Sequence, residues 1–239
     1  MLMQVTEVTE NFNPNNIVPF FQPIMDLSNN AVWSYECLAR LLTFDQSSYL
    51  PTEFLFLVER QQSNALLTKS VLGRSASYFR DINMAWNINL SLADMTDKDT
   101  LAFVHSQLVD YPNPQRISIE ITAQNALSQT ALFTQFATLC RTLGINIVID
   151  NFEQQTDELI KLMSLPISAV KVSAQLFEQI KDEPELGLFI NQLMTLAKAN
   201  NIVVIAERIE HQSTLNIVKQ LGIKYAQGFY FSQPKATAD

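Results

Sequence analysis

Eight short apolar runs, separated by stretches with helical spacing, predict an α/β fold, a (β/α)8 TIM-type barrel whose first strand is reversed. The chain has 239 residues, of which 47% are hydrophobic. Barrels of this class commonly fill such a length as a single domain. The first two runs are joined only by residues 28–30, Ser-Asn-Asn. Because this connection is too short for a parallel crossover and typical of a hairpin turn, these two strands should be antiparallel.

The predicted strands and helices alternate along the chain. The apolar runs are, in order, PFFQPIMDL, AVWSYECLA, AWNINLS, RISIEIT, NIVID, AVKVS, NIVVIAE and YAQGFYF. Helices are expected at 52–62, 64–80, 97–110, 125–143, 155–164, 174–181, 185–200 and 213–221. In the stretch 185–200, apolar residues recur at the spacing that places Leu186, Ile190 and Leu193 on one helix face. Gly144 and Gly222 follow helical stretches, as expected of C-cap glycines.

The ends of the chain and its cysteines indicate domain organisation and compartment. Residues 1–16 are polar and acidic, and we expect a flexible lead-in or linker remnant before one barrel domain over 17–239. No run is long and apolar enough to span a membrane, and no Lys or Arg precedes Arg40 to start a secretory signal. Cys37 and Cys140 lack metal-ligand spacing and are expected to be reduced thiols. We therefore expect a cytoplasmic protein without a membrane segment.

The charge of the chain limits its ligands. The formal net charge is −8, and no basic stripe is present, which argues against a nucleic-acid groove. A small phosphate ligand remains compatible with this charge, because one or two placed arginines over a metal can hold it.

Most of the predicted strands end in a polar residue, which indicates an active site at the barrel rim. These residues are Gln22, Glu36, Asn89, Glu120, Asp150, Lys171, Glu207 and Gln227. Inward and outward side chains alternate in a barrel, so Glu120 should point towards the mouth while Ile119 and Ile121 pack under helices. A single carboxylate of this kind could be a surface or capping group, but several that each close a buried strand favour a functional site.

The chemistry of these residues favours a divalent cation with oxygen ligands. Three carboxylates and the Asn89 carboxamide suit Mg²⁺ or Mn²⁺ rather than zinc, which prefers His and Cys. Lys171 and Glu207 are then candidates to orient or deprotonate a water beside the metal. Arg40 could pair with a phosphate oxygen or form an ordinary exposed salt bridge. His105 and His211 lie elsewhere and are expected to be solvated or packing side chains.

Several segments resemble a known family. FFQPIMDL followed by YECLAR resembles the opening of EAL domains, the bacterial phosphodiesterases that open cyclic di-GMP. Further on, NINLS, IEIT, IDNF, LPISAVKVS, IAERIE and LGIKYAQGFYFSQP resemble the remaining blocks of the family in order. The resemblance covers residues 18–234, nearly the whole chain.

This resemblance implies a role for each rim residue in bacterial cyclic di-GMP signalling. Glu36, Asn89, Glu120 and Asp150 match the ligands of a first Mg²⁺ or Mn²⁺; Lys171 and Glu207 match the residues that manage the attacking water; Gln22, Arg40 and Gln227 match those that seat the dinucleotide. A carboxylate directly after the position of Asp150 holds a second metal in active members, and the two metals clamp an in-line displacement at phosphorus. Members often pair through a surface near the loop after Asp150, so the resemblance also implies a homodimer.

The sequence departs from the family pattern around the second metal. The block Asp-Asp-Phe-Gly-Thr-Gly is here Asp150 followed by Asn-Phe-Glu-Gln-Gln. An amide thus replaces a carboxylate at Asn151, and Glu153 and Gln155 replace glycines, which should change the shape of the loop. Further departures are Ser173 for an aspartate, Ala123 for a glutamate and Arg208 for a glycine.

These departures predict a degenerate member whose first metal site keeps its ligands and whose second does not. Hydrolysis should then be very slow or absent, and the protein should act by binding cyclic di-GMP, a partner protein, or both. The alternative is an active metal-dependent phosphodiesterase that tolerates Asn151 and Ser173 and releases the linear dinucleotide. A third hypothesis is an unrelated metal-dependent barrel enzyme with another substrate.

Overall fold

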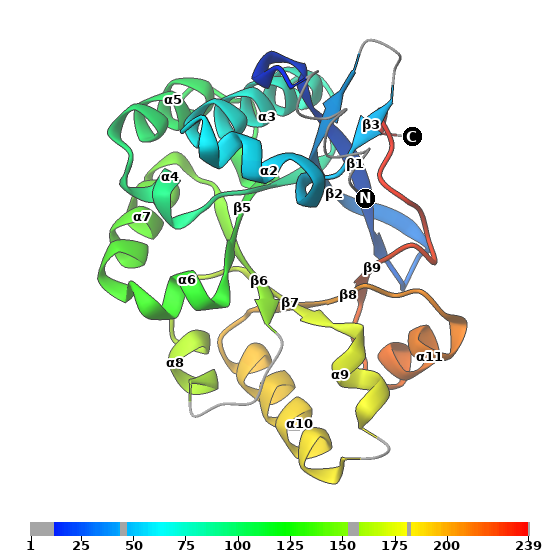
Figure 1. Cartoon of the computed structure of the whole chain (residues 1–239). Helices are drawn as coiled ribbons and strands as arrows, with labels where there is room; N and C mark the ends of the chain where they lie inside the picture. Colours follow the sequence, from blue (N-terminus) through cyan, green and yellow to red (C-terminus); the bar gives the residue numbers. More distant parts are fainter. Residues whose placement is uncertain (1–11, 44–46, 153–157, 181–182, 239) are drawn as a thin grey trace.

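The computed structural model describes residues 12–43, 47–152, 158–180 and 183–238. Within these residues eight strands form a closed barrel, and the helices lie outside it (Figure 1). The barrel strands are β1 (Ile17–Asp26), β2 (Ala31–Leu42), β4 (Ala85–Asn89), β5 (Ile117–Thr122), β6 (Asn146–Phe152), β7 (Ala169–Ser173), β8 (Val203–Glu207) and β9 (Tyr225–Gln227). Their order around the sheet is β1-β9-β8-β7-β6-β5-β4-β2, and pairing of β2 with β1 closes the ring. The predicted barrel is confirmed.

The first strand is reversed, as its short connection predicts. β1 pairs antiparallel with both β2 and β9, whereas the other neighbours around the barrel are parallel. In this hairpin Gln22 lies directly opposite Glu36, which brings two predicted site residues together at once. The short strand β3 (Ser48–Tyr49) pairs with the end of β2 outside the barrel. This strand is not predicted, because two residues are too few to show an apolar pattern.

The helices that cover the barrel mostly match the predicted stretches. They are α2 (Pro51–Arg60), α3 (Asn64–Phe79), α4 (Leu92–Thr96), α5 (Lys98–Leu108), α6 (Ala123–Ser128), α7 (Thr130–Leu143), α8 (Leu159–Met163), α9 (Ala174–Gln179), α10 (Pro184–Ala199) and α11 (Gln212–Gln220), with short 3-10 turns η1 (Pro14–Asn16) and η2 (Pro114–Arg116). No helix in the described part of the chain is both long and apolar enough to cross a membrane.

Two helical features differ from the prediction. The single helix predicted over 125–143 is divided, because Gln129 leaves the helical conformation (φ −129°, ψ 51°) between α6 and α7. The short helix α4 is not predicted, although Ser91 and Asp94 form the capping box that starts it. The predicted stretch 155–164 corresponds to α8, and its first residues lie outside the described part of the chain.

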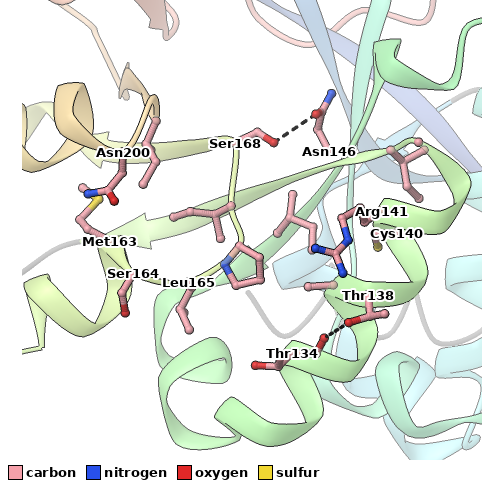
Figure 2. A pocket seen from close by; sticks show the side chains of 17 residues that line it. Thr134, Thr138, Cys140, Arg141, Asn146, Met163, Ser164, Leu165, Ser168 and Asn200 are labelled. Carbon is pink, nitrogen blue, oxygen red and sulfur yellow. Dashed lines mark hydrogen bonds between the residues drawn. The ribbon is translucent and has the colours of Figure 1, made fainter.

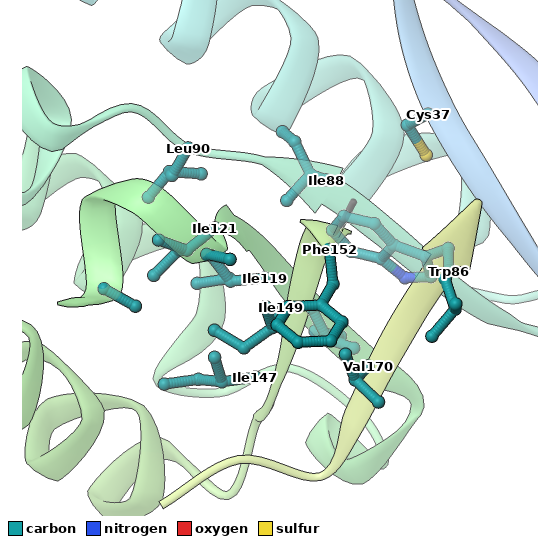
Figure 3. Close-up of a cluster of buried hydrophobic side chains, with 14 of the residues drawn as sticks. Cys37, Trp86, Ile88, Leu90, Ile119, Ile121, Ile147, Ile149, Phe152 and Val170 are labelled. Atoms are coloured by element: carbon teal, nitrogen blue, oxygen red, sulfur yellow. The ribbon is translucent and has the colours of Figure 1, made fainter. Parts of the chain in front are cut away.

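Outward side chains of the strands form the main hydrophobic core with the helices. Ile119, Ile149 and Val170 gather there with aromatic side chains such as Phe152 (Figure 3). Ile119 and Ile121 therefore pack under helices, as the alternation of β5 predicts, while Glu120 faces the barrel interior. Burial of this layer is the dominant favourable contribution to stability.

A second, smaller cluster fills the barrel interior below the polar rim. It consists of Ile24, Val148, Ala169 and Ile205, which are nearly or completely buried. The Trp33 and Tyr225 rings pack against it, with centroids 4.2 Å apart. This apolar plug closes one end of the barrel, so that polar side chains on the same inward faces gather at the other end.

The turn glycines and the cysteines agree with the sequence. Gly144 caps α7 in the left-handed conformation (φ 73°), as predicted. Cys37 and Cys140 are buried free thiols. The C-terminal segment returns to the barrel, where Lys235 and Phe21 exchange two backbone hydrogen bonds of 2.7 and 2.9 Å.

Candidate functional site

A pocket of about 390 Å³ opens at the mouth of the barrel, where the parallel strands end. Of the predicted site residues, Gln22, Glu36, Asp150, Glu207 and Gln227 line it. Their positions follow from strand periodicity, because inward residues two apart along each strand line the barrel interior in layers.

Lys171 is the centre of the site. Its side chain is fully buried, and Nζ lies 2.7 Å from Glu36 Oε2, 2.7 Å from Glu120 Oε2 and 4.0 Å from Asp150 Oδ1. Burial alone would lower the pKa of Lys171, but the carboxylates of Glu120 and Glu36 raise it well above 10.5. The ammonium therefore stays charged and neutralises part of the carboxylate cluster.

The two carboxylates that contact Lys171 differ in their proton affinity. Burial would raise the pKa of Glu36. The charge of Lys171, and the hydrogen bonds that Glu36 accepts from Lys171, Gln227 and Asn89, lower that pKa to about 2. Burial and the neighbouring Glu36 charge instead raise the pKa of Glu120 well above 4.5. One ammonium cannot balance several buried carboxylates, so one of them holds a proton more tightly.

Two carboxamides donate hydrogen bonds to Glu36, and a third, Gln22, contacts one of them. Asn89 Nδ2 donates to Glu36 Oε1 at 2.8 Å, and Gln227 Nε2 donates to Glu36 Oε2 at 2.7 Å. Gln227 Nε2 also lies 3.1 Å from Gln22 Oε1, and Gln22 Nε2 donates to the Ser232 carbonyl at 3.0 Å. Residues from β1, β2, β4 and β9 are thus joined in one hydrogen-bonded network.

Asn87 is a buried member of the site that the strand-end argument missed. Its Nδ2 donates to Glu120 Oε1 at 2.8 Å, and its Oδ1 accepts from Ser34 Oγ at 2.8 Å. Asn87 precedes Asn89 by two residues and shares its inward face, so strand alternation contained the signal. Asn87 leaves Glu120 Oε2 to Lys171 by occupying the other oxygen.

Asp150 and Glu207 contribute oxygens that are not hydrogen bonded within the described structure. Asp150 Oδ1, Glu207 Oε1 and Gln227 Oε1 are all buried without a hydrogen-bond donor there. Burial and the Asp150 charge raise the pKa of Glu207 to about 7. Buried polar atoms without partners are uncommon in native structures, and these three converge on one pocket.

Arg40 lies further out along β2. Its Nη1 donates to the Ala39 carbonyl at 2.7 Å, and its guanidinium lies 5.8 Å from the centroid of the Phe20 ring. Leu38, on the same strand face, lines the pocket between Arg40 and Glu36. Of the two histidines, His105 lies within α5 and His211 directly before α11, as predicted.

The predicted departures from the family pattern that the structure describes lie at or directly after the ends of β5, β6, β7 and β8. Asn151 and Arg208 both have left-handed backbone conformations (φ 52° and 60°), and Arg208 Nη2 donates to Asn151 Oδ1 at 2.7 Å. Ser173 is buried and its hydroxyl accepts from Gln175 N at 3.4 Å at the start of α9. Ala123 is buried in the first turn of α6. Glu153 and Gln155 lie outside the described residues.

Two larger hollows lie at the opposite end of the barrel. One, of about 670 Å³, is lined by α7, by the segment after α8 and by the starts of β6 and β7. In Figure 2, Ser168 points towards Asn146, to which its hydroxyl donates a hydrogen bond. The other, of about 920 Å³, lies beside α10 and the starts of β8 and β9. The predicted site residues line neither hollow, so size alone does not locate the chemistry.

Comparison with known proteins decides the family. The EAL domain family matches residues 6–234. This chain belongs to the EAL domain family.

Two relatives with curated descriptions are longer than this chain. The chain is 23% identical over 244 residues to the cyclic di-GMP phosphodiesterase RocR of Pseudomonas aeruginosa, covering 98% of this chain and 61% of RocR. It is 24% identical over 240 residues to the signaling protein YkoW of Bacillus subtilis, covering 97% of this chain and 29% of YkoW. The chain thus spans less than two thirds of the length of either relative.

Solved EAL structures share the barrel. The FimX EAL domain of Pseudomonas aeruginosa bound to c-di-GMP superposes with a TM-score of 0.83 at 21% identity, covering 100% of this chain and 97% of that chain. The PaMucR phosphodiesterase in complex with c-di-GMP superposes with a TM-score of 0.83 at 19% identity, covering 98% and 97% of the two chains. At these identities the likeness shows the fold.

The mouth of this EAL domain offers oxygen donors of the kind that a divalent cation prefers. Within the described residues, no three His, Cys, Asp or Glu side chains are grouped around a common metal position, because Glu36 and Glu120 close on Lys171. The donor chemistry of the carboxylates and the buried unpaired oxygens of Asp150 and Glu207 nevertheless suit one hard divalent ion.

The described residues that directly follow Asp150 add no carboxylate to this side of the mouth. The Asn151 side-chain oxygen accepts a hydrogen bond from the Arg208 guanidinium, so a positive charge lies beside Asp150. Ser173 offers a neutral hydroxyl on the neighbouring strand.

Proposed function

We propose that this EAL domain binds cyclic di-GMP at the barrel mouth and opens it very slowly or not at all. Relatives described as cyclic di-GMP phosphodiesterases and EAL structures solved with c-di-GMP support the ligand. The pocket volume of about 390 Å³ falls within the range of about 300 to 1,000 Å³ common for small-molecule sites.

The hydrogen-bonded carboxamides support ligand binding. In the proposal Gln22 and Gln227 seat the dinucleotide, and Arg40 contacts a phosphate. Gln22 and Gln227 already hold each other and Glu36 in place, so little side-chain entropy would be lost on binding. Arg40 would have to give up its local contact with the Ala39 carbonyl to reach a ligand.

The proposed metal and catalytic roles follow the same residues. Glu36, Asn89, Glu120 and Asp150 would hold one Mg²⁺ or Mn²⁺, and the ion would supply positive charge to polarise a phosphoryl oxygen. Lys171 would hold the carboxylates in position through its two contacts of 2.7 Å. Glu207, whose pKa is raised to about 7, would accept a proton from water.

The hydrogen bond from Arg208 to Asn151 is the main observation that supports slow turnover. A two-metal displacement needs anionic ligands for the second ion, and here that position pairs a neutral amide with a cation. Ser173 removes a further carboxylate. Losses in a metal's outer ligands typically cost about 10- to 100-fold in affinity or activity, and loss of direct ligands should cost more.

Two measurements test the proposal. Calorimetry with cyclic di-GMP and Mg²⁺ or Mn²⁺ should give saturable heat, and chromatography after hours of incubation should show little or no linear dinucleotide. The triple variant Asn151→Asp, Ser173→Asp, Arg208→Gly should restore turnover if the second metal is the cause. Rapid hydrolysis by the wild-type protein would favour the active phosphodiesterase instead.

A regulator that acts only by docking on a partner protein is the other form of the binding hypothesis. It predicts no heat with cyclic di-GMP up to high ligand concentration in the presence of divalent metal. A homodimer through the surface near the loop after Asp150 would be tested separately by sedimentation.

A further inference from the structure

Two pairs of consecutive residues face the mouth pocket, which regular strands do not allow. Asp150 and Asn151 both line it, and so do Glu207 and Arg208. In β6 the cause is a bulge: Ile149 lies opposite Val170 and Phe152 opposite Val172, so two residues of β6 stand against one of β7. The left-handed conformations of Asn151 and Arg208 turn each second side chain towards the pocket.

The hydrogen bond between Arg208 and Asn151 joins the ends of two strands that are not neighbours in the sheet. Asn151 belongs to β6 and Arg208 follows β8, while β7 lies between them in the sheet. β7 ends in Ser173, a short side chain whose hydroxyl is engaged with Gln175 N. The Arg208 guanidinium is therefore fixed at the rim by an oxygen from a non-adjacent strand.

The charges around the pocket give this guanidinium a specific role. The lining contains the carboxylates of Glu36, Asp150, Glu207 and Glu210, and Arg208 is the single cationic side chain among the described residues that line it. Lys171 lies beneath the pocket and is occupied by Glu36 and Glu120. Arg40 lies outside this lining, further along β2, so an anionic group inside the pocket meets carboxylates unless it contacts Arg208 or a metal.

We propose that Arg208, held by Asn151, is a built-in cation that binds a phosphate group of the ligand in place of a second metal. This inference rests on the proposed function, because it takes cyclic di-GMP as the ligand. It goes beyond it by assigning a ligand-binding role to a residue that departs from the family pattern, and by making the phosphate contact independent of divalent ions. A planar guanidinium suits a phosphate because two of its N–H groups can donate to two oxygens.

The test is a cyclic di-GMP titration of the full chain in EDTA and in excess Mg²⁺. Wild type should bind in both, and Arg208→Gln should weaken binding in EDTA by about 10- to 100-fold, the range expected for losing a charge-assisted hydrogen bond. Asn151→Ala should weaken it less, because the guanidinium loses one hydrogen-bond partner and keeps its charge. Arg141→Gln, an equal charge change on α7 at the opposite end of the barrel, should leave the affinity unchanged.

Thermal unfolding separates binding from a merely structural role. Arg208→Gly should keep or raise the melting temperature of the ligand-free protein, since glycine adopts φ 60° without strain, and should lose the binding in EDTA. A lowered melting temperature with unchanged affinity would make Arg208 a structural link and overturn the inference. Binding that requires Mg²⁺ in the wild type would also overturn it and leave the proposed function standing. Absence of binding under both conditions would remove the proposed function, and the inference with it.

Discussion

Lys171 holds together carboxylates that would otherwise repel one another inside the barrel. Its two partners, Glu36 and Glu120, lie 135 and 51 residues away in the sequence and come from different sides of the barrel. The desolvation cost of burying these charges is large, so the arrangement holds only while every charge has a partner.

Replacing Lys171 with Met should lower the free energy of unfolding by about 3–5 kcal/mol, because two buried carboxylates lose their cation. The loss should be smaller at pH 5 than at pH 8, since carboxyls with raised pKa values can take up protons at the lower pH. Urea denaturation at both pH values measures it. Lys198→Met on the exposed face of α10 is the control and should change stability by less than about 0.5 kcal/mol. Equal losses in the two variants would contradict the assignment.

Glu207 should make stability depend on pH near neutrality. Its pKa is raised from 4.5 to about 7 in the folded protein, so its favourable contribution is complete below about pH 4.5 and is lost as the pH rises through 7. In EDTA, the wild type should lose up to about 3 kcal/mol between pH 5 and pH 8 relative to Glu207→Gln. Thermal unfolding of both proteins across this range measures the difference. Parallel pH profiles would show that Glu207 is ionised throughout.

At the scale of elements, the regular helices and strands are predictable because their patterns are local. The helix α10 follows its apolar spacing, and β5 follows its alternation. The break at Gln129 and the bulge after Ile149 are not predictable from those patterns, because each changes the backbone at one or two residues and leaves the apolar spacing on either side intact. The bulge lies in the strand that carries Asp150 into the site, where local rules are most often overridden.

The turn after β9 depends on close backbone approach at Gly228. A Cβ atom there would lie 2.0 Å from the Ile209 carbonyl oxygen and 2.3 Å from its nitrogen. The same Ile209 backbone donates to the Gln227 carbonyl at 3.0 Å and accepts from Tyr230 N at 3.0 Å, so this contact positions Gln227 in the pocket.

Gly228→Ala should therefore lower stability by at least about 1–3 kcal/mol and weaken ligand binding, because the backbone must move to relieve the clash. The matched control is Gly187→Ala in α10, where the added Cβ would meet only Ile180 Cγ2 at 3.6 Å. That change should be neutral or stabilising by up to about 1 kcal/mol, since alanine favours a helix interior. Denaturation midpoints compare the stability of the two variants. A loss of stability in Gly187→Ala without one in Gly228→Ala would contradict the close approach at Gly228.

At the scale of the whole molecule, closure of the barrel makes the site. Pairing of β1 with both β2 and β9 brings Gln227 to Glu36 across 191 residues of sequence. The apolar plug below and the helices around the barrel exclude water from the carboxylate layer, which strengthens each polar contact there.

The sequence by itself determined the barrel, its reversed first strand, the polar strand ends and the EAL family, because apolar periodicity, a short turn and ordered motifs are properties of the linear chain. Only the tertiary structure decided that Lys171 joins Glu36 to Glu120, that Asn87 supports Glu120, and that Arg208 reaches Asn151. These contacts depend on strand register, on a bulge and on left-handed backbone conformations. No local pattern encodes such features, because they arise where distant segments pack together at the rim.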